Sequence, residues 1–224
     1  MPLDLDYDVY GGPDAPVMVL LHALGDDRST WQGVGTAFAA THRVYAPDQR
    51  GSGRSPWPGE YSFELMRDDV IAFLDRHELR EVTLAGHSMG GTVAWLVAEE
   101  RPDLLARLVL EDTPPPRAPQ TPRQIPDRPI ELPLAVDWAL IVSLLKQLND
   151  PDPAWWDRAV EIAIPTLVIA GGPDSHIPQD QLAELASRVA DGRLVTIPVG
   201  HHVHRERPEE FLAALRSFLP PPPG

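Results

Sequence analysis

Residues 82–91 of the chain read Val82-Thr83-Leu84-Ala85-Gly86-His87-Ser88-Met89-Gly90-Gly91, a short apolar run that passes through a glycine-rich turn into a helical pattern. The turn contains the motif G-x-S-x-G, and the apolar run before it has the composition of a buried strand. In such a turn the serine backbone is strained, while Gly86 and Gly90 allow the strand and the helix to approach closely. The pattern predicts that the Ser88 hydroxyl projects at the carboxyl end of a sheet, beside a positively polarised helix terminus.

Apolar runs of strand length alternate with amphipathic stretches of helix length along most of the chain. This alternation is typical of a parallel sheet with helices on both faces. The expected strands are 17–21, 44–46, 82–85, 108–110, 166–170 and 194–197, with 5–10 as an antiparallel edge strand. The expected helices are 31–40, 63–76 with Ser62 as N-cap, 89–100, 182–189 and 208–219. The predicted fold class is therefore α/β, with a mostly parallel central sheet of about seven strands flanked by helices.

A proline-rich segment interrupts this alternation between residues 113 and 133. Its eight prolines fix φ and remove amide donors, so the segment cannot lie inside a sheet. Beyond it, apolar spacing predicts a helix over 136–148 and a second short helix after Asp152-Pro153. The expected organisation is a core of 1–112 and 164–219, a small helical cap over 113–163, and a flexible tail at 220–224.

The composition restricts the partners and the location of the protein. A formal net charge of −14 opposes nucleic acid and anionic lipid surfaces, so a small uncharged substrate fits better and no nucleic-acid or membrane partner is expected. The absence of cysteine removes disulfides, thiolate nucleophiles and thiolate metal sites. The first residues lack the pattern of a secretory signal, and no apolar run is long enough to cross a bilayer. We therefore expect a cytoplasmic protein, for which the sequence indicates no oligomeric state.

A serine hydroxyl becomes a nucleophile only beside a base, and a third group must hold that base in the correct tautomer. Two carboxylates are candidates for the third group. Asp174 follows the expected strand 166–170 in a tight turn, and its place in the chain and this turn favour it as the acid. Asp112 ends the preceding strand and is the rival, because a carboxylate one strand earlier can also reach the base.

The base is sought after the last expected strand, where three histidines occur. His201 directly follows Gly200 and is the predicted base, with His202 as the fallback. Together with His204, these residues also suggest a metal site. Their spacing in a loop does not converge easily on one ion, however, and the neighbouring sequence offers no carboxylate to complete a ligand set. We therefore expect no metal.

The expected reaction also needs hydrogen-bond donors for a tetrahedral oxyanion. The predicted donors are the backbone N–H groups of Met89 and Leu24, the latter in the loop after strand 17–21. His22, in the same loop, is interpreted as a buried histidine that orders the loop. Tryptophans of the expected cap suggest an apolar acyl or aromatic pocket, and they are Trp138, Trp155 and Trp156.

Three motifs in this order resemble the α/β-hydrolase superfamily, in particular its esterase, enol-lactonase and cofactor-free haloperoxidase-like branches. They are Gly86-His87-Ser88-Met89-Gly90-Gly91, Asp48-Gln49-Arg50-Gly51-Ser52-Gly53-Arg54-Ser55, and Gly200-His201 before Arg207-Pro208-Glu209-Glu210-Phe211. The resemblance covers nearly everything except the cap, and it is specific to the superfamily but not to a substrate. It implies the α/β-hydrolase fold, a triad of Ser88, Asp174 and His201, oxyanion donors from Leu24 and Met89, and no cofactor.

The chain departs from the superfamily pattern in three places. Ala23 stands where many members carry glycine, the first of the usual eight strands has no counterpart, and the cap is short and proline-rich. Serine at position 88 argues against the branches whose nucleophile is an aspartate. The sequence thus predicts a carboxylesterase-like serine hydrolase acting on a small ester or lactone through an acyl-enzyme on Ser88. Two alternatives stay open: a non-hydrolytic ligand-binding protein of the same fold, or a biosynthetic C–C hydrolase, perhydrolase or cyclase.

Overall fold

The computed structural model describes residues 1–127 and 135–220. Within this part of the chain, seven strands form one sheet in the order β1-β3-β2-β4-β5-β6-β7, with β1 antiparallel to β3 and the other pairs parallel. The strands are β1 (Tyr7–Tyr10), β2 (Val17–Leu21), β3 (Arg43–Pro47), β4 (Val82–His87), β5 (Leu105–Glu111), β6 (Thr166–Ala170) and β7 (Gly192–Thr196). This confirms the predicted sheet and its antiparallel edge. The last strand begins two residues before the predicted 194–197, because backbone pairing with β6 starts at Gly192.

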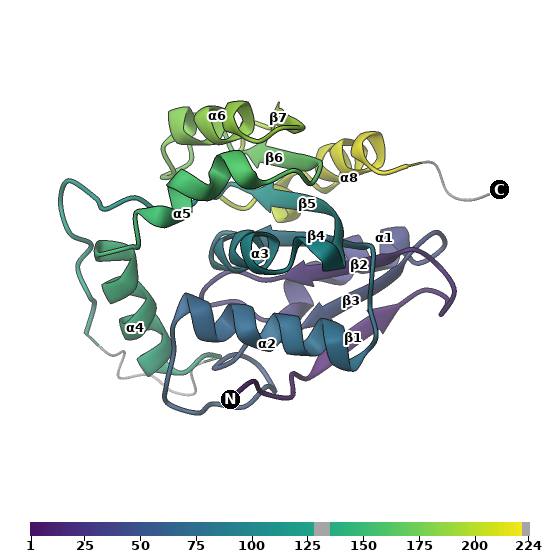
Figure 1. Ribbon diagram of the computed structural model, residues 1–224, viewed down its shortest axis with the longest axis horizontal. Coiled ribbons are helices and arrows are strands. Elements are labelled where there is room, and N and C mark those ends of the chain that lie inside the picture. The colour runs from purple at the N-terminus through teal and green to yellow at the C-terminus, as the bar shows by residue number, and fades with distance from the viewer. Residues whose placement is uncertain (128–134, 221–224) are drawn as a thin grey trace.

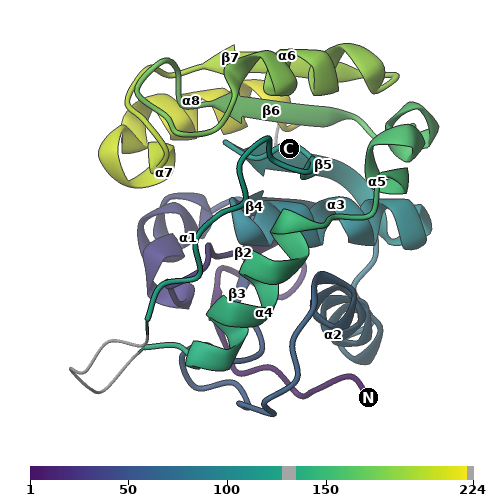
Figure 2. The same ribbon diagram turned by 90° about the vertical axis from the view of Figure 1, so that its left-hand side faces the viewer.

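Helices cover both faces of the sheet (Figure 1). They are α1 (Gln32–Phe38), α2 (Phe63–Arg76), α3 (Met89–Glu100), α4 (Trp138–Asn149), α5 (Ala154–Asp157), α6 (Gln179–Arg188), α7 (Val203–Glu206) and α8 (Pro208–Phe218). Figure 2 shows α1 and α8 on one side of the strands and α2 and α3 on the other. The side chain of Ser62 accepts a hydrogen bond from Leu65 N and caps α2 as predicted. The short helix α7 was not predicted from the sequence.

The buried strand β2 shows how the sheet separates two apolar cores. Met18 and Leu20 pack with residues of α1 and α8, whereas Val19 and Leu21 pack with residues of α2 and α3. All four side chains are fully buried. Successive side chains of a strand point to opposite faces, so a strand between two helical layers needs apolar residues at every position. Polar side chains that carry chemistry are therefore confined to the strand ends.

The proline-rich segment leaves the sheet after β5. Its described residues, 113–127, form neither helix nor strand, in agreement with the prediction that the segment lies outside the sheet, and residues 128–134 lie outside the described chain. After this gap, the backbone lies against the loop that follows β3. Gly53 N donates to Ala135 O at 3.2 Å, and Asp137 N donates to Gly51 O at 2.7 Å. Helices α4 and α5 follow, and α4 crosses in front of the strands in Figure 2. The predicted tail falls mainly on residues 221–224, which also lie outside the described residues.

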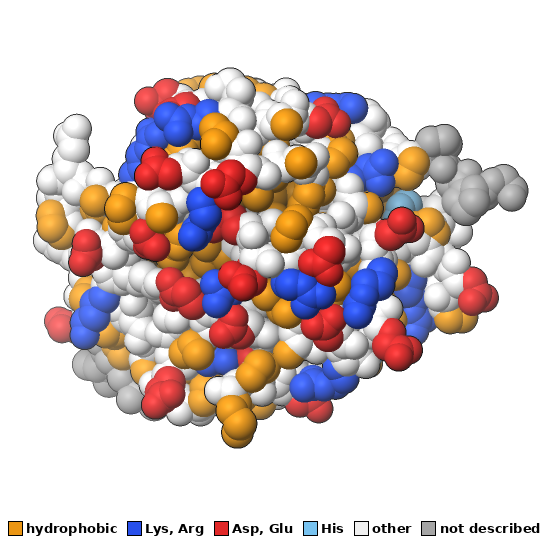
Figure 3. Space-filling model, viewed as in Figure 1, with side chains coloured by type: hydrophobic (Ala, Val, Ile, Leu, Met, Phe, Trp, Pro, Cys, Tyr) orange, Lys and Arg blue, Asp and Glu red, His pale blue; other side chains and the backbone are white. Residues whose placement is uncertain are grey.

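Two surface properties bear on the predicted partners. No helix in the described ranges is both long and apolar enough to cross a membrane. On the face shown in Figure 3, acidic and basic side chains are interspersed. The expected cytoplasmic location stays a prediction.

Candidate active site

Ser88 lies between β4 and α3 in a backbone conformation that few residues adopt. Its φ is 52° and its ψ is −116°, and its N–H donates to Glu111 O on β5 at 3.1 Å. A Cβ atom on Gly86 would lie 2.2 Å from Gly90 O, and one on Gly90 would lie 2.3 Å from Leu21 O. Only glycine allows backbones to approach this closely. The strained turn predicted from the sequence is therefore present, and strain of this kind is characteristic of functional sites.

A cavity of about 820 Å³ opens at Ser88. This volume is within the usual range for small-molecule sites. Its apolar lining includes Leu24, Phe63, Met89, Leu144, Leu145 and Leu148. The prediction of a pocket lined by Trp138, Trp155 and Trp156 is wrong, because none of them lines this cavity. Trp155 and Trp156 are buried in the core instead, and Trp155 packs edge-on against Phe63.

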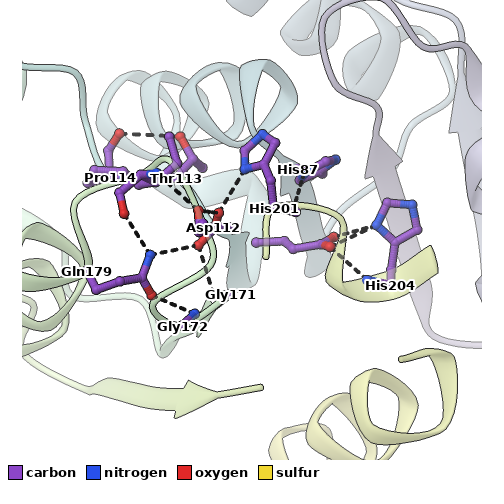
Figure 4. A network of polar contacts seen from close by, with 12 residues as sticks. His87, Asp112, Thr113, Pro114, Gly171, Gly172, Gln179, His201 and His204 are labelled. Carbon is purple, nitrogen blue, oxygen red and sulfur yellow. Dashed lines mark hydrogen bonds and ion pairs between the residues drawn. The ribbon is translucent and has the colours of Figure 1, made fainter. Parts of the chain in front are cut away.

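His201 is paired with Asp112 at the end of β5 (Figure 4). Its Nδ1 atom lies 2.8 Å from Asp112 Oδ2; the Asp112 side chain is fully buried and that of His201 is 13% exposed. Asp112 has a φ of 47°, so a second strained residue lies at this edge of the sheet. Because a carboxylate can only accept, Nδ1 of the neutral imidazole carries the proton and Nε2 is the basic nitrogen.

Other donors converge on the Asp112 carboxylate. Oδ2 accepts from Ser175 Oγ at 2.5 Å. Oδ1 accepts from Gly171 N at 2.8 Å and from Gln179 Nε2 at 3.3 Å (Figure 4). Burial acts to raise the pKa of Asp112, but the hydrogen bonds from His201, Ser175 and the other donors outweigh it and hold the pKa below its usual value. Asp112 is thus a fixed, ionised carboxylate.

The choice of Asp174 as the partner of His201 is corrected by this geometry. The Asp174 side chain is exposed and makes no hydrogen bond within the described part of the chain. Asp112 is the first residue after β5, whereas Asp174 lies four residues beyond β6, and Ser175 rather than Asp174 turns toward the carboxylate. Chain order could not reveal this, because it does not fix how a turn directs its side chains. The order serine, acid, histidine is retained with Asp112.

His87 connects the nucleophile turn to the histidine loop. Its Nε2 donates to His201 O at 2.8 Å, and the centroids of the His87 and His201 rings are 4.6 Å apart. Burial lowers the pKa of His87 to about 4, so the ring is a neutral donor at pH 7. Among the described residues, Ser88 Oγ and the His201 imidazole form no hydrogen bond with each other. Such bonds are often long in the free enzyme and tighten when substrate binds.

The predicted oxyanion donors lie at the same cavity. Leu24 and Met89 both line it, and Met89 begins α3, so its N–H has no acceptor within the helix. Gln49 N donates to His22 Nε2 at 3.0 Å, which leaves Nδ1 to donate to Ala23 O at 2.9 Å. Both ring nitrogens of this buried histidine are therefore used to hold the loop, as interpreted from the sequence. The donor roles of Leu24 and Met89 stay a prediction.

A second acid–histidine pair lies beneath the first and was not foreseen. His204 Nδ1 lies 2.7 Å from Glu111 Oε2, and both side chains are 1% exposed. The His204 ring stacks on Trp31 at 4.1 Å. Burial acts to raise the pKa of Glu111, but the neighbouring His87 and His204 outweigh it and lower the pKa. The sequence contains two adjacent acids and a run of histidines, but it does not show which acid pairs with which histidine.

Two groups of side chains have metal-ligand spacing in the described structure. One contains Asp26, His87 and His202, the other His87, Glu111 and His204, and in each the candidate ligand atoms lie within 4.8 Å of one another. The tertiary fold therefore brings a carboxylate, from Asp26 or Glu111, close to the histidines after β7, although neither is near them in the sequence. In the second group Glu111 already accepts hydrogen bonds from the N–H and the ring of His204. His202, the fallback base, forms no hydrogen bond or ion pair with Asp112, which pairs with His201 instead.

Comparisons with known proteins identify the family of the chain. Residues 16–132 match the family model for the alpha/beta hydrolase fold. The chain is 26% identical over 263 residues to sn-1-specific diacylglycerol lipase ABHD11 from Mus musculus, covering 97% of this chain and 86% of that protein. A hydrolase from Pseudomonas aeruginosa PA01 superposes with a TM-score of 0.85 at 26% identity, covering 97% of this chain and 94% of the other. Est816, an N-acyl homoserine lactone degrading enzyme, superposes with a TM-score of 0.74 at 28% identity, covering 97% of each chain. Since the matching segment spans more than half of its sequence, this protein belongs to the alpha/beta hydrolase fold family.

Proposed function

We propose that this protein is a serine hydrolase that cleaves a carboxylic ester or lactone of a small molecule through an acyl-enzyme on Ser88. The observation that carries the proposal is the 2.8 Å contact between Asp112 and His201 next to the strained serine turn. The cavity at Ser88 supplies space for a substrate. The names of the relatives, a diacylglycerol lipase and a lactone-degrading enzyme, support ester or lactone chemistry.

In the proposed mechanism, Ser88 Oγ attacks the carbonyl carbon while His201 Nε2 accepts the hydroxyl proton. The N–H groups of Leu24 and Met89 donate to the oxyanion of the tetrahedral intermediate. The intermediate collapses when protonated His201 donates its proton to the leaving oxygen, which leaves an acyl group on Ser88. Water, deprotonated by His201, then releases the acid and restores the serine. Asp112 stays ionised throughout and orients the imidazole.

The segment 113–163 has the proposed role of a cap over this site. Leu144, Leu145 and Leu148 on α4 line the cavity together with Ser88. Apolar walls of this kind stabilise a bound acyl chain by about 0.8 kcal/mol for each methylene that leaves water. The cap thus favours an acyl chain over a very small polar acid such as formate.

A fluorophosphonate probe tests the nucleophile, and p-nitrophenyl butyrate tests the turnover. We expect mass spectrometry to find the probe on Ser88 and both signals to disappear in Ser88→Ala. A folded wild type with neither label nor turnover would contradict the proposal and favour the ligand-binding alternative. Labelling without ester turnover would retain the nucleophile but exclude the ester reaction, as for a C–C hydrolase, perhydrolase or cyclase.

A further inference from the structure

The charge of the cavity is opposite to the charge of the whole protein. The chain carries a formal net charge of −14, yet the described residues that line the cavity include Arg117 and Arg123 and no Asp or Glu. An acidic protein repels anions at long range, but a cation without an acidic partner at the rim of a pocket binds them at short range. The net charge, from which an uncharged substrate was expected, therefore does not describe the charge of the residues that line the cavity.

Arg117 is already neutralised. Its two terminal nitrogens bind both oxygens of Glu184, each at 2.8 Å. The guanidinium also lies over the Trp156 ring, 3.7 Å from the ring centroid. A bidentate ion pair and a covering aromatic ring leave this side chain little capacity for a ligand. Arg117 therefore ties the segment after β5 to α6.

Arg123 is fixed at the cavity in a different way. Its backbone N–H donates to Asn149 Oδ1 at 2.7 Å, and Asn149 Nδ2 donates to Arg123 O at 2.9 Å. Its Nη1 donates to Leu148 O at 2.7 Å, at the carboxyl end of α4. The residue is thereby held beside Leu148, which lines the same cavity as Ser88. A guanidinium has five N–H donors, so one bond to a carbonyl leaves most of them for a ligand.

The positive charge of Arg123 is not balanced by an acid in the described structure. No described carboxylate oxygen lies within 4.0 Å of the Arg123 guanidinium nitrogens. The Arg117 guanidinium, by contrast, pairs with Glu184. The Arg123 side chain is exposed, although its neighbours displace enough water to lower its pKa. Burial also lowers the pKa of His176, and the Arg123 charge adds to that shift. Because the His176 ring lies 4.3 Å from the His201 ring, the charge of Arg123 acts close to the proposed base.

We propose that Arg123 is an anion-binding residue of the substrate pocket, and that the substrate is an ester or lactone whose acyl chain carries a second, carboxylate group. This inference rests on the proposed function and specifies its substrate class. The leucines of α4 pack against the acyl chain, and the guanidinium binds the terminal carboxylate through paired N–H donors. An arginine that only capped α4 would use the same bond to Leu148 O but would not discriminate between charged and neutral substrates.

Matched ester pairs test this discrimination. The p-nitrophenyl half-ester of adipate and p-nitrophenyl hexanoate have six-carbon acyl chains that end in a carboxylate or a methyl group. We expect the wild type to have the higher kcat/KM for the half-ester. Arg123→Gln should lower the ratio of the two values roughly 10- to 100-fold, the loss expected for a hydrogen bond to a charged group, mainly through KM. Arg123→Lys should recover part of the ratio, because lysine keeps the positive charge but lacks the paired N–H donors of a guanidinium.

Arg193→Gln is the matched control for net charge. Arg193 is an exposed residue of β7 and does not line the cavity, so this variant should retain the wild-type ratio within twofold. Two results would overturn the inference while leaving ester hydrolysis intact. One is a wild-type kcat/KM that is higher for the hexanoate than for the half-ester. The other is a ratio of the two kcat/KM values in Arg123→Gln that equals the wild-type ratio. Equal losses on both esters together with a lower Tm would assign Arg123 to helix capping alone and would also overturn it.

A binding measurement separates this inference from the proposed function. Calorimetric titration of Ser88→Ala with the two esters does not depend on turnover. We expect tighter binding of the adipate half-ester, and loss of the difference in the double variant with Arg123→Gln. Equal binding of both esters would reject the anion-binding role even if the protein hydrolyses neither of them.

Discussion

Asp112 Oδ2 and His201 Nδ1 lie 2.8 Å apart although 89 residues separate them in the chain. The preceding residue, Glu111, makes a similar contact with His204. Consecutive side chains at a strand end point in opposite directions, so adjacent acids meet different partners. His201 of the first pair is 13% exposed, whereas both side chains of the second pair are 1% exposed. The two pairs together fix the loop after β7 that carries His201.

The first prediction concerns the identity of the orienting acid. Asp112→Asn should lower kcat for p-nitrophenyl butyrate roughly 10³- to 10⁴-fold, because an amide in this place stabilises the wrong imidazole tautomer. Asp174→Asn is the matched control, and it should keep kcat within about twofold because its side chain is exposed. Steady-state kinetics of the two variants decide between the carboxylates. A larger loss in Asp174→Asn would show that the acid moves in the working enzyme.

The second prediction concerns the enclosed pair. His204→Ala should lower the free energy of unfolding by about 3 to 5 kcal/mol, because it leaves Glu111 as a buried charge without its partner. Urea unfolding followed by circular dichroism measures this change. Arg80→Ala removes the half-exposed contact with Asp75, so its effect should stay below about 1 kcal/mol. Similar losses in the two variants would mean that Glu111 is not ionised.

The third prediction concerns the close approach at the nucleophile turn. Gly90→Ala places a Cβ atom 2.3 Å from Leu21 O and should destabilise the protein by about 1 to 3 kcal/mol or more, with a loss of kcat. Gly33→Ala, in the exposed part of α1, meets no atom within 4 Å and should stabilise it by up to about 1 kcal/mol. Thermal unfolding and kinetics of both variants check the contrast. A neutral Gly90→Ala would show that the turn relaxes without cost.

The fourth prediction concerns stability at low pH. The folded-state pKa of Asp112 is depressed below the unfolded value of about 3.9, so its ionisation stabilises the protein above that pH. This contribution is lost as the pH falls below about 4 and through the folded-state pKa. The difference in free energy of unfolding between wild type and Asp112→Asn should therefore shrink from pH 6 to pH 2.5 in urea titrations. A difference that is constant over this range would disprove the depressed pKa.

The fold was largely predictable because its signals are local. The run Thr166–Ala170 is buried at every position and apolar after Thr166, and it was predicted with the bounds that the structure has. Ser88 was recognisable because glycines on both sides of it mark a turn that only small residues permit. By contrast, β7 has exposed positions such as Leu194, and pairing with β6 rather than its composition sets its bounds.

The partners of the histidines were not predictable in the same way. Asp112 and Asp174 both follow a strand, and the sequence favoured Asp174 by chain order. The left-handed backbone of Asp112 directs its carboxylate to His201, and this conformation is imposed by contacts with β6, such as the bond from Asp112 N to Ile169 O. No local pattern encodes a conformation that distant residues impose.

The sequence by itself determined the sheet, its flanking helices, the serine turn and the family, because apolar periodicity and glycine spacing act over a few residues. Only the tertiary structure decided that Asp112 is the partner of His201, that Glu111 and His204 form a buried pair, and that Arg123 joins the serine at one cavity. These relationships join residues that lie tens of positions apart. Their distances and burial arise only when the strands are placed side by side.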